Sequence, residues 1–441
     1  MGQMSRREFL GNGGKAAMGI AAIGSALSGQ AVAAKKVGAN DKIVMGFIGM
    51  GGMGMANMDH FLGMPDVEVA AVCDVDTRRV DIASAEVEKR KGKKPESIHD
   101  FRKMLENKDI DAVCISTPDH WHALPMILAC EAGMDVYVEK PIGHDIIEGR
   151  AMVGAAKKYG SVVQVGTWQR SVQHYVDAMR FVQSGKLGKI AIVRAWTCGG
   201  AGTGKVKPTA APQGLDWDFW VGPAKWEPFR TNLCPGAFRW YFNYAAGLTG
   251  DWGVHMMDTV GTFMNEWHPQ EVAAFGGKLI CGEDDDRTTP DTLISLFKFP
   301  NWVMQWEAHV GGPGLDGGGG HGAEFIGETG VLRIDRGGYN WDPKGDSQKE
   351  GPVATEKLPS DHWQDFIECM RSRKKPRSDI ETMHYVSTMC HLANTAYLLG
   401  RSVKWDGAKG EIVGDKAAMR CQSYAREYRK PWTLPRHDLE L

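Results

Sequence analysis

The sequence has no Cys-x-x-Cys pair, and its nine cysteines follow no regular spacing. A disulfide framework or a zinc knuckle is therefore not expected, and no metal site is predicted. The chain also lacks an excess of basic residues. Its formal net charge is −2 with acidic and basic residues interspersed, which excludes a surface built for nucleic acid. It has no internal repeat and no apolar run strong enough to form a stable membrane anchor.

What the sequence does have is ordinary globular composition and many tryptophans. Its 441 residues are 43% apolar and 24% charged, which is enough for two domains and a large core. The 15 tryptophans fall mostly in the second half. Such rings predict either a deep core or a stacking surface for a ring-shaped ligand.

The N-terminus carries the pattern of an export signal. Arg6 and Arg7 precede Phe9 and Leu10, and a mildly apolar stretch ends in the small residues of 31–33. This matches a twin-arginine signal peptide over residues 1–33, so we predict a periplasmic or secreted protein. The twin-arginine route exports folded proteins, so a nucleotide could be enclosed before transport. A disordered N-terminal tail is the alternative.

A nucleotide-binding turn follows the first predicted strand. Gly49, Gly51 and Gly54 have G-x-G-x-x-G spacing between the apolar run 42–48 and a helical stretch. The first glycine permits a tight turn, the second lets a pyrophosphate approach the backbone, and the third allows helix and strand to pack closely. The helix N-terminus, with Met53 in its first turn, would then face the phosphates.

The second predicted strand ends in Asp74. A carboxylate there can accept hydrogen bonds from an adenosine ribose and would repel a 2′-phosphate, which favours NAD over NADP. Arg78 and Arg79 nearby oppose that preference. The alternative for Asp74 is an ordinary turn residue.

Strands and helices alternate through residues 42–165, which predicts an α/β Rossmann domain with a doubly wound parallel sheet. Ligands of such sheets bind at the carboxyl ends of the strands. We therefore expect further cofactor contacts from the residues that follow later strands, namely Thr117, Pro118, His122, Glu139 and Lys140.

The second half contains a histidine flanked by two carboxylates. Asp251, His255 and Asp258 are separated by four and three residues, which places them on one face of a helix. A histidine oriented by a carboxylate can accept the proton of an alcohol. The alternatives are a helix cap at Asp251, a core histidine at His255, or two metal ligands that lack an obvious third.

Substrate contacts are expected from aromatic and polar residues around this helix. Aromatic side chains crowd the glycine- and proline-broken segment 216–249, and most of them are expected to pack that segment onto its own domain. The apolar face of a sugar ring stacks on such rings while polar groups bind its hydroxyls. The predicted substrate residues are Trp168, Arg170, Arg239, Tyr241 and Asp258.

From residue 186 onward the pattern becomes one of strands at hairpin-like spacing, which predicts an open, mainly antiparallel sheet. We expect an α+β domain for substrate binding and oligomerisation over 166–400, and a C-terminal extension over 401–441 that packs back on the body. A homo-oligomer, either dimer or tetramer, is expected. His321 lies within the glycine-rich stretch 311–322 and is expected to be a solvated loop residue. The alternative is that it reaches the cleft of its own or a neighbouring subunit.

Three motifs together resemble the Gfo/Idh/MocA oxidoreductase family. They are S-T-P-x-x-x-H at 116–122, E-K-P at 139–141 and D-x-G-x-H-x-x-D at 251–258. The resemblance covers almost all of the sequence beyond the signal. It implies that Lys140 lies near the nicotinamide and the reacting hydroxyl, with Pro141 in the cis form. It also implies that His255 is the base, with Lys140 and Asp251 orienting the substrate.

The function implied by this resemblance is hydride transfer between tightly bound NAD and a hydroxyl of a sugar, glycoside or cyclitol. A redox-neutral glycosidase or lyase, which oxidises a ring hydroxyl transiently and then eliminates, is the alternative on the same scaffold. A non-catalytic sugar-binding protein is a third reading, and the intact Lys140, Asp251 and His255 argue against it.

Overall fold

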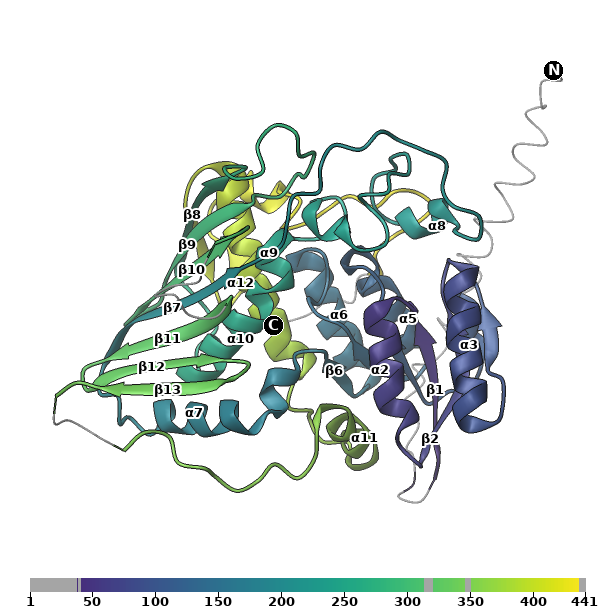
Figure 1. Ribbon diagram of the computed structural model, residues 1–441, viewed down its shortest axis with the longest axis horizontal. Coiled ribbons are helices and arrows are strands. Elements are labelled where there is room, and N and C mark those ends of the chain that lie inside the picture. The colour runs from purple at the N-terminus through teal and green to yellow at the C-terminus, as the bar shows by residue number, and fades with distance from the viewer. Residues whose placement is uncertain (1–37, 39–40, 313–319, 346–349, 436–441) are drawn as a thin grey trace.

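A computed structural model describes residues 38, 41–312, 320–345 and 350–435 (Figure 1). The twin-arginine stretch and the predicted signal peptide of residues 1–33 lie outside the described residues. The predicted fold class is confirmed: a parallel α/β sheet and a second, mainly antiparallel sheet form two domains that lie side by side in Figure 1.

The first sheet has six strands in the order β3-β2-β1-β4-β5-β6, and every pairing within it is parallel. The runs of β4 and β5 are buried at every position, as expected for strands covered on both faces. The strands are β1 (Ile43–Ile48), β2 (Val67–Cys73), β3 (Glu96–Ile98), β4 (Ala112–Ile115), β5 (Asp135–Val138) and β6 (Val163–Val165).

Helices connect these strands and cover the sheet (Figure 1). Asp76, Asp100 and Asp145 cap three of them by accepting hydrogen bonds from the first turn. The helices are α2 (Gly52–Leu62), α3 (Thr77–Lys91), α4 (Phe101–Glu106), α5 (Ala123–Glu131) and α6 (Ile146–Tyr159), with the short 3₁₀ helix η1 (Asp119–Trp121).

The second sheet has the order β13-β12-β11-β7-β10-β9-β8-β14-β15. Its pairings are antiparallel except that of β7 with β10, so the prediction of a mainly antiparallel sheet is confirmed. The strands are β7 (Ile190–Cys198), β8 (Glu271–Gly277), β9 (Thr292–Lys298), β10 (Val303–His309), β11 (His321–Gly327), β12 (Gly330–Asp335), β13 (Gly338–Pro343), β14 (Val403–Asp406) and β15 (Glu411–Ile412).

Helices α9, α10 and α12 lie between this sheet and the Rossmann domain (Figure 1). The long α12 runs between the two domains, and its His384 lies so close to Gly149 of α6 that a Cβ on that glycine would be 2.5 Å from Nδ1. The helical elements after β6 are η2 (Trp168–Ser171), α7 (Gln173–Gln183), α8 (Trp217–Val221), η3 (Ala237–Trp240), α9 (Gly247–Asp251), α10 (Gly253–Met264), α11 (His362–Ser372), α12 (Ile380–Leu399) and η5 (Ala418–Arg420).

Two segments depart from a simple division of the chain at residue 165. Helix α11 packs Phe366 against Phe61 and Tyr137 of the Rossmann core, although it lies late in the sequence. The segment beyond β15 also returns to the Rossmann domain, where Arg426 forms an ion pair with Glu148 of α6 at 2.6 Å. The two domains are therefore joined by buried contacts as well as by the chain.

Candidate active site

The glycine turn between β1 and α2 is shaped so that side chains are excluded from it. Gly49 has φ of +87°, and a Cβ there would lie 2.7 Å from the backbone nitrogen of Thr117. A Cβ on Gly54 would lie 1.9 Å from the carbonyl oxygen of Gly49. Gly51 forms the N-cap of α2. The turn and the helix N-terminus therefore offer backbone N–H groups to a phosphate at close range.

A cavity of about 400 Å³ begins at this turn and extends to the second domain. Its volume lies within the range of about 300–1,000 Å³ that is usual for ligand sites. The predicted cofactor residues Gly49, Gly51, Met53, Asp74, Thr117, Pro118, His122, Glu139 and Lys140 line it, and so do the predicted site residues Arg239 and Asp251. Gly54 is buried beneath the turn and does not line the cavity.

The end of the cavity near β2 has the groups that an adenosine ribose needs. The Asp74 carboxylate accepts hydrogen bonds from the backbone nitrogens of Met50 at 2.7 Å and Asp76 at 2.9 Å. Burial raises the pKa of this carboxyl, and the two backbone N–H groups oppose the rise. Arg79 also lines the cavity here, while Arg78 is held by Asp76 at 2.7 Å.

His122 and Glu139 hold the middle part of the cavity wall in place through hydrogen bonds. The His122 ring lies 2.7 Å from the Pro141 oxygen and 2.8 Å from the Thr117 oxygen, so it joins two strand-end loops. Glu139 accepts a hydrogen bond at 3.0 Å from Asn57 of α2. The peptide bond between Lys140 and Pro141 is cis, as the family resemblance implies.

The far end of the cavity is an ion pair between the two domains. Lys140 Nζ lies 2.6 Å from Asp251 Oδ1 and 3.0 Å from the Asp251 carbonyl oxygen. Arg239 Nε lies 3.4 Å from the same Oδ1. Burial alone would raise the pKa of Asp251, but the charges of Lys140 and Arg239 outweigh burial and hold it below the usual value. Asp251 is therefore ionised and shared by two cations.

His255 lies one turn beyond this ion pair, in the first turn of α10. Burial lowers its pKa well below the ordinary value, and the neighbouring Lys140 charge lowers it further. Its Nδ1 is buried and has no hydrogen-bond partner among the described residues. The ring is therefore neutral at neutral pH and able to accept a proton.

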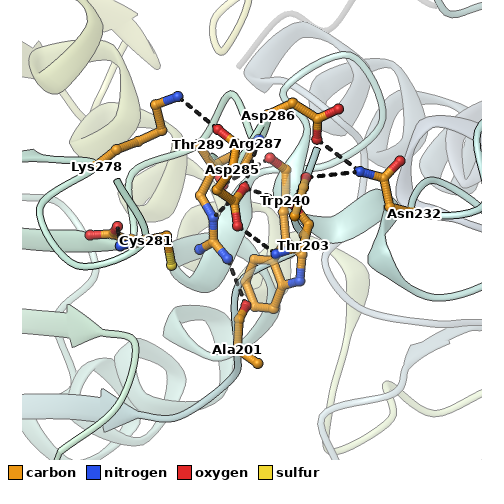
Figure 2. A network of polar contacts seen from close by, with 12 residues as sticks. Ala201, Thr203, Asn232, Trp240, Lys278, Cys281, Asp285, Asp286, Arg287 and Thr289 are labelled. Carbon is orange, nitrogen blue, oxygen red and sulfur yellow. Dashed lines mark hydrogen bonds and ion pairs between the residues drawn. The ribbon is translucent and has the colours of Figure 1, made fainter. Parts of the chain in front are cut away.

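The segment that carries Arg239 is anchored by the polar network of Figure 2. Arg287 is fully buried, donates to the Ala201 carbonyl oxygen at 2.7 Å and lies with its guanidinium carbon 5.2 Å from the centre of the Trp240 ring. The Trp240 carbonyl oxygen accepts from Thr289 Oγ1 at 3.1 Å. These contacts fix η3, and with it Arg239, at the mouth of the cavity.

Three predicted substrate residues instead stabilise the fold. Tyr241 is buried, and its hydroxyl donates to Asp286 and accepts from Asn232 at 2.8 Å, because the ring packs inside the segment. Arg170 and Asp258 form a buried bidentate ion pair with an Nε to Oδ1 distance of 2.9 Å. None of the three lines the cavity.

The helix predicted across 251–258 is also interrupted. Helix α9 ends at Asp251 and α10 begins at Gly253, with Trp252 between them. Asp258 lies farther along α10 and is directed to Arg170 of η2, because a buried carboxylate requires a partner. Asp251 therefore lines the cavity, whereas His255 lies one turn beyond it and Asp258 is turned away to Arg170.

The sequence reasoning missed several residues of this region. Asp119 lines the cavity, and burial raises the pKa of its carboxyl. Its position inside the S-T-P-x-x-x-H motif was an available signal. Trp252 and Arg336 were not predicted either, and they form a stack near His255 with Trp168, which was a predicted substrate residue. His321 packs on Trp252 with 4.7 Å between ring centres. His321 is thus half-buried rather than solvated.

The described residues offer no metal site and no membrane-spanning helix. No cluster of three or more His, Cys, Asp or Glu side chains there could hold a metal ion. No helix in that part of the chain is both long enough and apolar enough to cross a bilayer. All nine cysteines are free.

Several curated enzymes are similar to parts of this chain, and two of them differ in the reaction they are named for. Levoglucosan dehydrogenase of Pseudarthrobacter phenanthrenivorans is 27% identical over 225 residues, which cover 47% of this chain and 51% of that protein. Alpha-N-acetylgalactosaminidase of Shewanella oneidensis is 32% identical over 107 residues, which cover 23% of each chain. The chain thus matches about half or less of the length of these relatives.

Solved structures share the fold over a longer stretch. Scyllo-inositol dehydrogenase of Lactobacillus casei, solved with NAD(H) and scyllo-inositol, superposes with a TM-score of 0.61 and 19% identity over 82% of this chain and 99% of that one. Residues 43–167 match the model for the oxidoreductase family's NAD-binding Rossmann fold. Residues 179–274 and 348–434 match the model for the family's C-terminal alpha/beta domain. The chain belongs to the Gfo/Idh/MocA oxidoreductase family.

Proposed function

We propose that this protein is an NAD-dependent oxidoreductase that acts on a hydroxyl-bearing carbon of a sugar, glycoside or cyclitol. The observation that carries the proposal is the meeting of Lys140 and Asp251, 2.6 Å apart, at one end of a cavity that begins at the glycine turn of an NAD-binding domain. His255 follows within one helical turn. The names of the dehydrogenase relatives support this class of substrate.

The cavity residues fit NAD. Side chains are sterically excluded at Gly49 and Gly54, the helix N-terminus lies beside the cavity, and Asp74 ends the second strand. The glycine turn would hold the pyrophosphate and Asp74 the adenosine ribose, where its charge disfavours a 2′-phosphate. NAD, when bound, supplies the acceptor for the hydride that the substrate carbon loses.

The chain's own residues would activate the substrate. Lys140 donates a hydrogen bond to the reacting hydroxyl and stabilises the negative charge that develops on its oxygen. Asp251 is ionised and fixes the position of the Lys140 ammonium group. His255 is neutral and accepts the hydroxyl proton, directly or through one water. Arg239 shares the charge of Asp251 and so limits its movement.

Redox-neutral cleavage of a glycoside is a second candidate. The similarity to alpha-N-acetylgalactosaminidase favours it. In that chemistry the same groups would serve a transient oxidation, and the product would be a free aglycone with no net formation of reduced cofactor. The intact lysine of the E-K-P motif favours the dehydrogenase.

The outward face of the second sheet supports a homo-oligomer. Phe275 of β8 and Ile294 of β9 pair in register and are 74% and 43% exposed. Leu296, Ile192 and Val303 extend the same apolar surface across β9, β7 and β10. Gln305 and Glu307 of β10 interrupt this surface, and an exposed sheet face with several apolar side chains is typical of an interface between copies of one chain.

Export by the twin-arginine route also remains part of the proposal, on the pattern of Arg6 and Arg7. A protein that leaves the cytoplasm would have to carry its cofactor enclosed in the fold and regenerate it in place. This leads to the expectation of a dinucleotide that survives purification.

The test combines two measurements on the purified native protein. Mass spectrometry of the denatured protein is expected to find NAD, and a screen of sugars, glycosides and cyclitols is expected to give reduced nicotinamide with at least one of them. The proposal would be contradicted if the purified protein contained no NAD and also failed to bind NAD that is added to it. Release of an aglycone without reduced nicotinamide would select the glycosidase.

A further inference from the structure

Among the described residues, Arg336 has no ion-pair partner, and it lies near the proposed catalytic histidine. Arg336, in the turn between β12 and β13, has its guanidinium carbon 4.7 Å from the centre of the Trp168 ring and 4.5 Å from that of Trp252. Its Nε is buried and has no hydrogen-bond partner among the described residues. Leaving a buried charged donor unpaired costs about 1–3 kcal/mol or more, so this geometry is suited to a ligand.

This stack is continuous with the active site. Trp252 follows Asp251 in the chain, and its ring centre is 6.1 Å from that of His255. The Trp252 ring also contacts His321, whose Nε2 is buried without a partner in the described part of the chain. A molecule whose hydroxyl reaches His255 would therefore extend toward Arg336.

The carboxylates near Arg336 form their hydrogen bonds and ion pairs with other groups. Asp335 precedes Arg336, but its Oδ1 accepts hydrogen bonds from the backbone nitrogens of Gly337 at 2.7 Å and Gly338 at 3.1 Å. Asp258 is bound to Arg170. Asp251 is shared by Lys140 and Arg239. The substrate side of the site thus has a cation that the described part of the protein does not neutralise.

From this arrangement we propose that Arg336 binds a carboxylate of the substrate, which is therefore a sugar acid rather than a neutral sugar. The planar guanidinium fork matches a carboxylate, and the flanking indoles hold the fork in position while excluding water. The exposed parts of Trp168 and Trp252 then border the apolar face of the sugar ring. This inference rests on the proposed function, because it assigns a substrate class to the same site.

The test compares the binding of matched ligands to the NAD-loaded protein by calorimetry. The pairs are glucuronate against glucose and galacturonate against galactose, which differ at the carboxylate position. We expect at least one uronate to bind about tenfold or more tightly than its neutral partner, as expected for a charge-assisted bidentate contact. Arg336→Gln is expected to remove that preference.

Two further variants keep the result interpretable. Arg336→Lys retains the charge without the fork and is expected to retain part of the preference. Arg333→Gln changes an arginine of the same hairpin that pairs with Glu324 at 2.7 Å, and it is expected to leave the preference unchanged. Thermal unfolding of each variant verifies that it is folded.

Equal binding of the two members of each pair, binding of neither, or a preference that survives in Arg336→Gln would overturn the inference. The proposed function is judged separately, by the bound dinucleotide and by the formation of reduced nicotinamide. An enzyme that reduces NAD with neutral sugars and ignores the carboxylate would keep the proposed function and refute the sugar-acid assignment.

Discussion

Lys140, two residues beyond β5, and Asp251, at the end of α9, form an ion pair of 2.6 Å across the boundary between the two domains. Their side chains are only 15% and 18% exposed, so water screens the pair weakly. The pair closes one end of the proposed cofactor cavity and fixes an ammonium group next to His255. It is therefore the contact through which the Rossmann domain and the substrate domain would act on one molecule.

Replacement of this lysine tests its proposed role in polarising the hydroxyl. Lys140→Met is expected to lower kcat by about 10²-fold or more, because the donor that stabilises the developing alkoxide is lost. Steady-state kinetics and the cofactor content of the purified variant measure the effect. Lys157→Met, which removes a half-exposed lysine on α6 paired with Glu381, is the matched control and is expected to leave kcat unchanged. An equal loss in both variants would refute the role of Lys140.

His255 is expected to act as the base across the neutral range. Burial holds its pKa well below the ordinary value of 6.5, so the neutral form persists and kcat should not fall as pH drops through that value. His255→Gln is expected to lower kcat by about 10²-fold and to remove any acidic limb due to this residue. A pH profile of kcat for both proteins decides the matter. A limb at pH 6.5 that disappears in the variant would show that the ring titrates normally.

Stability is expected to fall on acidification below pH 6.5. Burial lowers the pKa of His120, His362 and His384 to about 3 and that of His391 to about 4. The unfolded chain therefore binds protons at these residues from about pH 6.5 downward, while the folded chain does not. Each histidine contributes a loss of about 1.4 kcal/mol per pH unit between these limits.

Denaturant unfolding at pH 7.5, 6.5 and 5.5 would measure this effect on stability. His384→Gln is expected to reduce the dependence of the unfolding free energy on pH, since it removes one of the titrating groups. An unfolding free energy that is constant over this interval would contradict the assignment of neutral, buried histidines.

The glycine turn is expected to tolerate no side chain at its third glycine. A Cβ on Gly54 would lie 1.9 Å from the Gly49 carbonyl oxygen, so Gly54→Ala must displace α2 from β1. We expect a loss of about 1–3 kcal/mol in unfolding free energy together with a lower NAD content. Gly199→Ala is the control, because no atom lies within 4 Å of a Cβ built there. Equal stability and NAD content in the two variants would contradict the close packing of the turn.

The Arg170–Asp258 pair is expected to stabilise the fold and not to bind substrate. Arg170→Met leaves the buried Asp258 without its cation, which should lower the unfolding free energy by about 3–5 kcal/mol. KM of the folded fraction, measured at reduced temperature, is expected to remain within about twofold of wild type because neither residue lines the cavity. A large rise in KM with unchanged stability would restore both residues to the substrate site.

Local patterns in the sequence were sufficient to predict the Rossmann domain. The glycine turn, the acid at Asp74 and the strand-end motif at Lys140 are each determined by a few neighbouring residues, since strand, turn and helix are consecutive there. The location of the proposed catalytic residues Lys140 and His255 was predicted from the family motifs and not from spacing alone. The open second sheet followed from alternation along its strands.

Long-range pairing could not be predicted in the same way. Arg170 and Asp258 were assigned to substrate because each is polar and near a motif, but they neutralise one another across 88 residues. The Tyr241 hydroxyl likewise donates a hydrogen bond to Asp286, which lies far from it in the sequence. Arg336 gave no signal at all, because its neighbours Trp168 and Trp252 come from segments far away in the chain. The helical spacing of residues 251–258 predicted one continuous helix and gave no indication of the break at Trp252.

The central claim is that Lys140 and His255 act together on a substrate beside enclosed NAD, and a single-turnover experiment tests it most directly. The purified protein is mixed with a reactive sugar without added cofactor, and the absorbance of reduced nicotinamide is followed in wild type, Lys140→Met and His255→Gln. The account predicts a rise of about one equivalent per bound cofactor in wild type and a rate at least about 10²-fold lower in each variant. Equal rates in all three proteins, or no rise in wild type that contains NAD, would contradict it.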